Sequence, residues 1–381
     1  MVAFGNLSIA QSIDQILNEI ESNNTNLSAL RKACDAEIIE NKTGLFLDNP
    51  EIEFHYLWGN PSLMGQRTDF SITQSFDFPS VYGHQKKIST LKNEQVELNY
   101  LKTQKKLRLE SRKILYQLMY LNALKQQSLQ RLEHAKSIAS SYESKFKVGE
   151  TNILEYNKSQ LNLLNLIKEV ENVEVERKEL LGELRGLNAG NGVVFEDTDH
   201  SELNLPLNFE QWYQQAEKLN PMLKWLQQEV ELSERQVKLS QAQNLPKIQA
   251  GYMSEKIPGE QFQGLVIGVS IPMWQNKNTV KYAMAHTQAV QGYSNDSKIA
   301  FYNRLKTLFD KTKSLQTNVK DYESQLEQFQ HIELLEKALT KGQITLIEYM
   351  LEQAIYYESH NKLLEMKREL NLSLAELYQF H

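Results

Sequence analysis

Two glutamates follow two matching glycines, and their type and spacing are the first hint of chemistry in this sequence. Glu155 lies six residues after Gly149, and Glu348 lies six residues after Gly342. A carboxylate can act in acid–base chemistry when another reactive group converges on it. Each of these glutamates instead begins a helical pattern, where a carboxylate suits the positive end of the helix dipole.

The other reactive residue types are scattered. The chain has eight histidines and one cysteine, Cys34, without His-x-x-x-His or Cys-x-x-Cys spacing. Met253, Met273 and Met284 could contact a soft metal, but packing is their simpler role. No phosphate-binding glycine loop, Gly-x-Ser-x-Gly or His-Glu-x-x-His is present. We therefore predict no enzyme activity, no catalytic residue, no metal site and no cofactor.

Hydroxyl and carboxylate side chains alternate with aromatic and aliphatic ones between Thr68 and Phe78. A strand would place the apolar residues on one face and the polar residues on the other. Such a polar face is commonly a solvated sheet surface. Alternatively it lines the lumen of a membrane barrel, and the lumen candidates are Asp69, Ser71, Thr73 and Asp77.

Each glycine marks a predicted turn between two long helices. The segments 147–156 and 340–349 match, and their glycines are 193 residues apart. Glycine readily adopts the left-handed conformation that ends a helix, and Thr151 or Thr345 can cap the next one. The predicted hairpin tips contain Lys147, Gly149, Glu150, Thr151, Lys341, Gly342, Gln343 and Thr345.

Further matches at offsets of 193 and 196 indicate two copies of one unit. The first repeat covers 1–190, with strands at about 51–58 and 68–78 and a tip near 149. The linker covers 191–207. The second repeat covers 208–381, with strands at about 247–256 and 263–271 and a tip near 342. We expect the two repeats to form one intertwined domain.

Long helical patterns make up most of the remaining sequence. The pattern predicts helices over 8–42, capped by Ser8 or Ser12, and over 80–146, 151–187, 208–243, 275–341 and 345–379, with an interruption at Asn220-Pro221. A 67-residue helix would be about 100 Å long. The strands and the hairpin tips would then lie at opposite ends of the molecule.

Composition excludes some classes of partner. The formal net charge is −6, so a nucleic-acid partner is not expected. A single cysteine cannot form an intramolecular disulfide. No apolar run reaches the roughly 20 residues of a membrane-spanning helix. Met1–Gly5 is too short to be a signal peptide by itself.

The four predicted strands set a condition on any membrane role. Four strands cannot close a barrel, since small closed barrels need about eight, and open edges are not tolerated in lipid. Three chains would supply twelve strands, an even number, and the long helices of the same trimer would form a cylinder.

The glycine tips, the internal duplication and the matched long helices resemble the TolC family of outer-membrane efflux channels, from about Ile9 to Leu377. This resemblance implies a mainly α-helical homotrimer. A twelve-stranded barrel would cross the outer membrane of a Gram-negative bacterium, and an α-helical barrel would extend through the periplasm. The chain would be the passive channel of a tripartite efflux system.

The resemblance also implies partners and roles for the tips. The tip residues would dock a periplasmic membrane-fusion adaptor linked to an inner-membrane pump, of the RND type, while outer-membrane lipid surrounds the barrel. Glu348, and by analogy Glu155, would form the periplasmic gate, where a carboxylate ring favours cations. Ile344 and Leu351 depart from the family's gate pattern, which has a basic residue and a second acid there.

Two alternatives stay open at this point. Asn49-Pro50-Glu51 and the absence of a large linker domain look most like the heavy-metal-efflux branch, so the cargo is either a metal cation or a drug or other small molecule. The competing function is a soluble, elongated coiled-coil scaffold or adaptor in which the strands form a small capping sheet.

Overall fold

The computed structural model describes residues 12–199, 204–329 and 332–380. The chain divides into two compact units, and each unit combines segments of both predicted repeats. One unit contains residues 1–29, 103–217 and 302–381, and we call it the helical unit. The other contains residues 30–102 and 218–301, and we call it the sheet unit.

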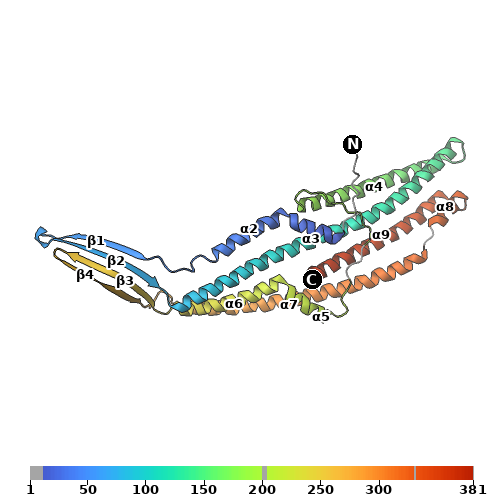
Figure 1. The fold of residues 1–381 in the computed structure, drawn as a ribbon. Helices are drawn as coiled ribbons and strands as arrows, with labels where there is room; N and C mark the ends of the chain where they lie inside the picture. The colour runs from blue at the N-terminus through green and yellow to red at the C-terminus, as the bar shows by residue number, and fades with distance from the viewer. Residues whose placement is uncertain (1–11, 200–203, 330–331, 381) are drawn as a thin grey trace, which may run out of the picture. The chain divides into compact units, whose positions relative to one another are not determined.

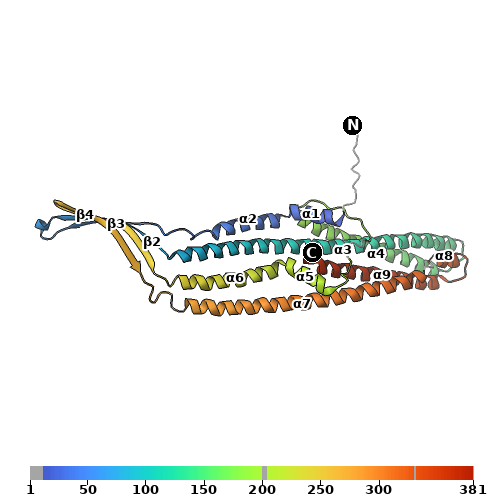
Figure 2. The same cartoon turned by 60° about the horizontal axis from the view of Figure 1, so that its bottom comes forward.

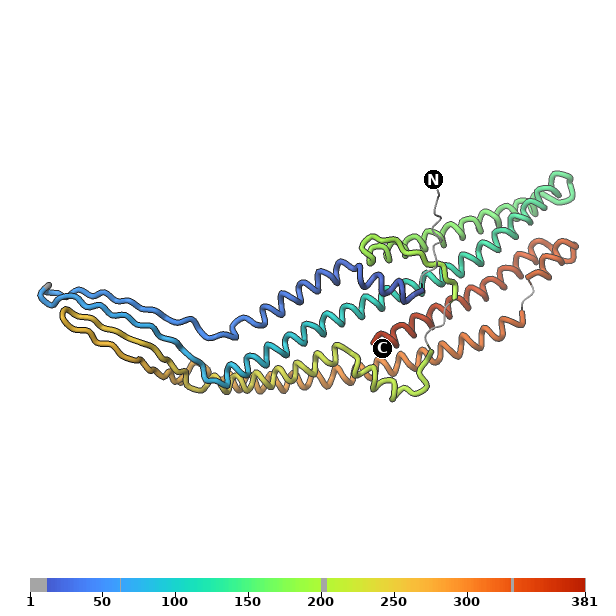
Figure 3. Tube along the Cα trace, in the orientation of Figure 1, coloured from blue at the N-terminus to red at the C-terminus, as the bar shows by residue number. Residues whose placement is uncertain are grey.

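The sheet unit is built around four antiparallel strands in the order β1-β2-β3-β4 (Figure 1). Their bounds are Glu51–Trp58, Gln66–Phe76, Lys247–Ile257 and Glu260–Ser270. Each half of the chain forms a hairpin, and pairing of β2 with β3 joins the two hairpins (Figure 3). All four strands were predicted, although β2 ends at Phe76 rather than at 78 and β4 begins at Glu260 rather than at 263.

Helices continue the sheet unit from both hairpins. They are most of α2 (Thr25–Glu40), the beginning of α3 (Pro79–Lys147), α6 (Pro221–Ala242) and the beginning of α7 (Thr279–Leu326). Val81 and Ile88 of α3 pack on Leu239 and Ala242 of α6 in a buried apolar cluster. This cluster fixes the helices that lead into β3 and out of β2.

The helical unit contains α1 (Ile13–Asn23), the beginning of α2, the remainder of α3, α4 (Ile153–Leu187), most of α5 (Phe209–Leu219), the end of α7, α8 (Ile332–Thr340) and α9 (Leu346–Leu377). Short 3-10 turns lie at Ser62–Met64, Glu327–Phe329 and Tyr378–Phe380. Within this unit α3 and α4 form one helical hairpin and α8 and α9 form another, with both turns at the same end (Figures 1 and 2). Leu132 and Ala135 of α3 pack on Leu166 of α4.

Three helix predictions need correction. The helix predicted over 8–42 is two helices, because Asn24 leaves the helical conformation with ψ of 115° and ends α1. Residues 8–11, including Ser8 and Ile9, lie outside the described residues, and Ser12 caps α1 as predicted. The helix predicted over 275–341 begins at Thr279, and α7 ends at Leu326, where no glycine or proline marks the break. The helix predicted from 151 begins at Ile153.

The predicted interruption at Asn220-Pro221 is confirmed. The Asn220 side chain accepts hydrogen bonds from the amides of Met222 and Leu223, and Pro221 occupies the first turn of α6. Proline suits this position because its missing amide would have no partner inside the helix.

Candidate functional site

The loop of the first helical hairpin joins α3 to α4 through Gly149. This glycine has a φ of +77°, and the amide of Glu150 donates to the carbonyl of Lys145 over 2.8 Å. That geometry ends a helix with a left-handed residue, as predicted. The expected cap is wrong by one residue, because Asn152 rather than Thr151 accepts from the amide of Glu155, over 2.9 Å. At the 193-residue offset, Asn152 and not Thr151 is the match of the cap residue Thr345.

The second turn joins α8 to α9 through Gly342, which has a φ of +68°. The amide of Gln343 donates to the carbonyl of Ala338 over 2.9 Å. Thr345 caps α9 as predicted, and its hydroxyl accepts from the amide of Glu348 over 3.3 Å. The Glu348 carboxylate accepts in return from the Thr345 amide over 2.7 Å, which completes a capping box.

The two matched glutamates therefore differ in what holds them. Hydrogen bonds from the Thr345 amide and then from its hydroxyl lower the pKa of Glu348, whose side chain is exposed. Glu155 is half-buried and lies 3.3 Å from the Lys158 ammonium. Both glutamates are at the third position of their helices, so a local structural role is present for each.

The predicted tip residues surround the two turns. Lys147 pairs with Glu143 over 2.6 Å, which raises the pKa of its ammonium. Thr151 is half-buried, and the others are exposed, namely Lys147, Gly149, Glu150, Lys341, Gly342, Gln343 and Thr345. Two small exposed polar surfaces thus lie at one end of the helical unit (Figure 2). Such surfaces can bind another protein without any reactive group.

Tyrosines behind the turns hold the hairpins together. Tyr156 stacks on Phe146 with ring centroids 5.1 Å apart. Its match, Tyr349, is completely buried, and its hydroxyl accepts from Gln353 over 2.9 Å. Burial raises the pKa of Tyr349 well above its usual range. The repeated tyrosines are therefore packing residues.

Sequence reasoning missed the polar contacts within the first hairpin and between the two hairpins. Arg131 of α3 bonds Glu169 of α4 over 2.9 Å and lies over the ring of Tyr357 of α9 at 4.6 Å. One turn further along α3, His134 lies 2.8 Å from Glu336 of α8. Glu169, Glu336 and Tyr357 are far from Arg131 and His134 in the sequence, so no local spacing indicated these contacts.

The sheet has two chemically different faces. The strand register puts Ile52 and Phe54 beside Ile72 and Phe70, and the same face continues over β3 and β4. These apolar residues are Ile52, Phe54, Tyr56, Trp58, Phe70, Ile72, Phe76, Ile248, Ala250, Tyr252, Leu265, Ile267 and Val269. Trp58 is 77% exposed, Leu265 85% and Ile267 79%. We call this set the apolar face.

The predicted lumen residues lie on the opposite, polar face or just beyond it. Asp69, Ser71 and Thr73 alternate with the apolar residues of β2, while Asp77 follows the end of that strand. Arg67 bonds Asp69 over 2.8 Å, and Lys247 pairs with Asp77 over 2.8 Å. Asp69 is buried despite its charge, since the Arg67 guanidinium covers it.

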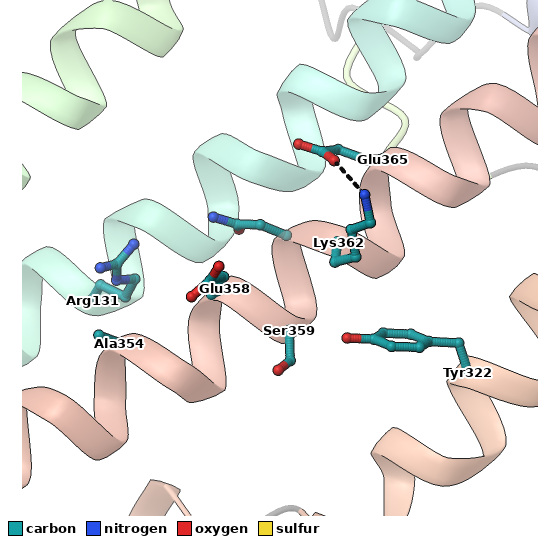
Figure 4. Close-up of a pocket in the computed structure, with 8 residues that line it drawn as sticks. Arg131, Tyr322, Ala354, Glu358, Ser359, Lys362 and Glu365 are labelled. Atoms are coloured by element: carbon teal, nitrogen blue, oxygen red, sulfur yellow. Dashed lines mark ion pairs between the residues drawn. The ribbon is translucent and has the colours of Figure 1, made fainter.

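A polar pocket of about 600 Å³ lies among α3, α7 and α9 of the helical unit (Figure 4). It is lined by Arg131, Tyr322, Ala354, Glu358, Ser359, Asn361, Lys362 and Glu365. Arg131 is paired with Glu169, and Lys362 lies 3.6 Å from Glu365. Its cations are therefore largely neutralised, and the pocket offers no obvious reactive group.

No group of three His, Cys, Asp or Glu side chains among the described residues could hold a metal ion. None of the helices in the described ranges is both long enough and apolar enough to cross a membrane.

Comparison with known proteins gives no match by sequence, because no family model and no curated protein matches the chain. Solved structures do match. The outer-membrane channel OprN has a TM-score of 0.78 and 13% identity, with 96% of this chain and 89% of that chain covered. CusC, described as forming a transmembrane channel, has a TM-score of 0.77 and 13% identity, with 97% and 92% covered.

A third match extends over nearly all of this chain. The CmeC outer-membrane channel of Campylobacter jejuni has a TM-score of 0.75 and 12% identity, with 99% of this chain and 90% of that chain covered. The chain therefore has the fold of the TolC-family outer-membrane channels, which confirms the predicted mainly α-helical subunit with a small β part.

Proposed function

We propose that this chain is one subunit of a trimeric channel in the outer membrane of a Gram-negative bacterium, extending into the periplasm. The apolar face of the sheet is the single observation that carries the proposal. Leu265, Ile267 and Val269 of β4 are each more than 60% exposed, and they continue a face that spans all four strands. An exposed apolar surface of this kind marks a contact with lipid or with another protein.

The strand lengths and end residues favour lipid over a protein partner. The strands have 8 to 11 residues, close to the roughly 9 to 11 residues of a membrane-spanning strand. Aromatic side chains stand at both ends of the sheet. Trp58 ends β1, whereas Phe46 precedes β1 and Trp274 follows β4 at the other end. Membrane strands carry aromatic girdles at both interfaces.

The sheet edges support the trimer. Within the described residues, β1 and β4 each pair with only one neighbour. Unpaired strand edges are excluded from lipid. In an alternating sheet, β4 of one copy is antiparallel to β1 of the next, so three copies close a barrel of twelve strands.

The channel is passive in this proposal, and its energy comes from an inner-membrane pump of the RND type. The exposed tips around Gly149 and Gly342 dock a periplasmic adaptor, and Glu348 and Glu155 line the gate. Asp69, Ser71, Thr73 and Asp77 face the lumen. The cargo is a heavy-metal cation or another small molecule, and export assays with each class distinguish them.

The first test is membrane location and assembly mass. The chain should be produced with a secretory signal, fractionated, extracted in mild detergent and measured by light scattering with detergent correction. We expect it in the outer-membrane fraction with three times the 44.2 kDa subunit mass. A monomer or dimer that is soluble without detergent would contradict the channel and favour the coiled-coil scaffold.

A further inference from the structure

Lysines gather where the helices of the sheet unit meet its strands. The segments 77–87, 238–247 and 271–281 contain six lysines and one acid, Asp77, although acids outnumber bases in the whole chain by 48 to 42. The six are Lys86, Lys87, Lys238, Lys247, Lys277 and Lys281. We call this set the lysine rim. It gives a positive charge to one end of the sheet in a chain that is acidic overall.

Five lysines of the rim have no carboxylate partner. Lys247 pairs with Asp77 over 2.8 Å, and Asp48, which precedes β1, attracts the same ammonium. The other five are exposed, and none of them forms an ion pair with a described residue. His84 lies half-buried in the same part of α3 and adds charge only when it is protonated. The rim therefore has a surplus of positive charge that an anionic partner would balance.

Exposed apolar side chains adjoin the rim on the strand side. Ile271, Met273 and Trp274 follow β4, and they are 68%, 71% and 79% exposed. Ile271 continues the alternation that places Val269 on the apolar face. The amide of Lys277 donates to the carbonyl of Trp274 over 3.2 Å, so this lysine directly follows the indole in a turn. Neighbouring aromatic and lysine side chains are typical anchors at a membrane–water interface.

A pocket of about 120 Å³ lies at the same place. Its apolar wall contains Phe78, Leu245 and Pro272, and its amide side chains are those of Gln243, Gln275 and Asn276. The Asn276 side chain donates to the Gln243 carbonyl over 2.6 Å, which holds two walls together. The Asp77–Lys247 pair also lines the pocket and adds no net charge. The pocket therefore suits a neutral group with both apolar and hydrogen-bonding atoms, next to Lys277.

Resting on the proposed function, we propose that the lysine rim binds anionic phospholipid of the periplasmic leaflet. The phosphate lies against Lys277 and Lys281, the glycerol esters enter the pocket, and the acyl chains extend along the apolar face. Basic clusters beside a membrane-embedded segment attract anionic headgroups. A zwitterionic headgroup gains less, because its own cation offsets its phosphate.

Native mass spectrometry of the purified trimer tests this by counting retained lipids. The trimer in mild detergent is mixed with phosphatidylglycerol or with phosphatidylcholine of the same acyl chains. We expect wild type to retain severalfold more phosphatidylglycerol, and the double variant Lys277→Gln, Lys281→Gln to lose at least half of that excess. Adding salt before the detergent exchange should also reduce the excess, since salt screens exposed charges.

Lys311→Gln, Lys313→Gln is the matched control, because it makes the same change at two exposed lysines of α7 in the helical unit. The control should keep the lipid preference. Equal retention of both lipids by wild type would overturn the inference, and so would an unchanged preference in the rim variant, an equal loss in the control or displacement of the lipid by inorganic phosphate. A chain that is soluble without detergent and forms no trimer would instead contradict the proposed channel. Circular dichroism and trimer mass confirm that each variant is folded.

Discussion

Glu348 shows how one side chain can serve local structure and a proposed pore together. Its carboxylate accepts from both the amide and the hydroxyl of Thr345. The matching Glu155 forms no capping box, because Asn152 caps its helix and the Glu155 carboxylate forms an ion pair with Lys158. The second turn is therefore fixed by a reciprocal pair, whereas the first depends on a single amide side chain.

This difference predicts unequal effects of alanine substitutions at the two threonines of the hairpin tips. Thr345→Ala removes an N-cap, which costs about 1 kcal/mol and speeds local opening about fivefold. Thr151→Ala removes no cap and should have little effect. Hydrogen exchange of segment 341–349, and of 148–156 for the control, measures both. Equal protection in the two variants would show that the capping box does not stabilise the turn.

The capping box should also make the second turn sensitive to acid. The Glu348 pKa is lowered from its ordinary value of 4.5 because the bonds from Thr345 favour the ionised form. Its stabilising effect is then complete above pH 4.5 and is lost as the pH falls through the lower folded-state value. In wild type, hydrogen-exchange protection of segment 341–349, corrected for intrinsic exchange, should fall as the pH passes through this lowered pKa. In Glu348→Gln it should stay constant, and a matching acid loss in that variant would contradict this assignment.

At the scale of elements, a buried polar group ties the linker between the halves to the helical hairpin. Asn122 of α3 donates to the carbonyls of Phe195 and Asp197 over 3.2 and 3.0 Å. Its amide oxygen accepts from Arg177 of α4 over 2.7 Å. Arg177 is buried, and its guanidinium also bonds Glu174 over 2.9 Å. Two helices and one extended segment thus share one side chain.

Asn122→Ala should therefore lower the free energy of unfolding by more than the small change in side-chain size suggests. It leaves an arginine and two carbonyl groups without their partner, and each buried unsatisfied group costs about 1–3 kcal/mol. The matched control is Glu196→Gln, at a side chain that is 75% exposed and 3.8 Å from Arg177, which should change stability by less than about 0.5 kcal/mol. Urea unfolding monitored by circular dichroism compares them, and equal midpoints would refute the anchoring role.

The elements differ in how well their sequences specified them. The alternation of polar and apolar residues along β2 and the glycines at 149 and 342 determine the backbone around them. The strands and turns could therefore be predicted from short stretches of sequence. The break after Leu326 has no glycine or proline, and the burial of Arg177 depends on Asn122 far along the chain. The pairing of β2 with β3 is likewise a long-range contact, which no short pattern encodes.

At the scale of the whole molecule, the central question is what covers the apolar face. A lone chain would expose Ile52, Phe54, Leu265 and Ile267 together, which is a surface typical of lipid contact or association. The polar face has the opposite requirement, because charged groups such as Arg67 and Glu255 are costly to place in lipid. Membrane insertion of an assembled barrel would cover the apolar face with lipid and leave the polar face in water.

Substitutions at two neighbouring residues of β4 test whether the apolar face contacts lipid in the assembled channel. Ile267 lies on the apolar face and Val266 on the polar face. A lysine facing lipid near the bilayer centre costs about 2–4 kcal/mol, whereas a lumen position tolerates it. Ile267→Lys should therefore reduce trimer in the outer-membrane fraction severalfold, and Val266→Lys should assemble normally while shifting selectivity toward anions. In a soluble scaffold Ile267 is simply an exposed residue, so normal yield of both variants without detergent would contradict lipid contact at this face.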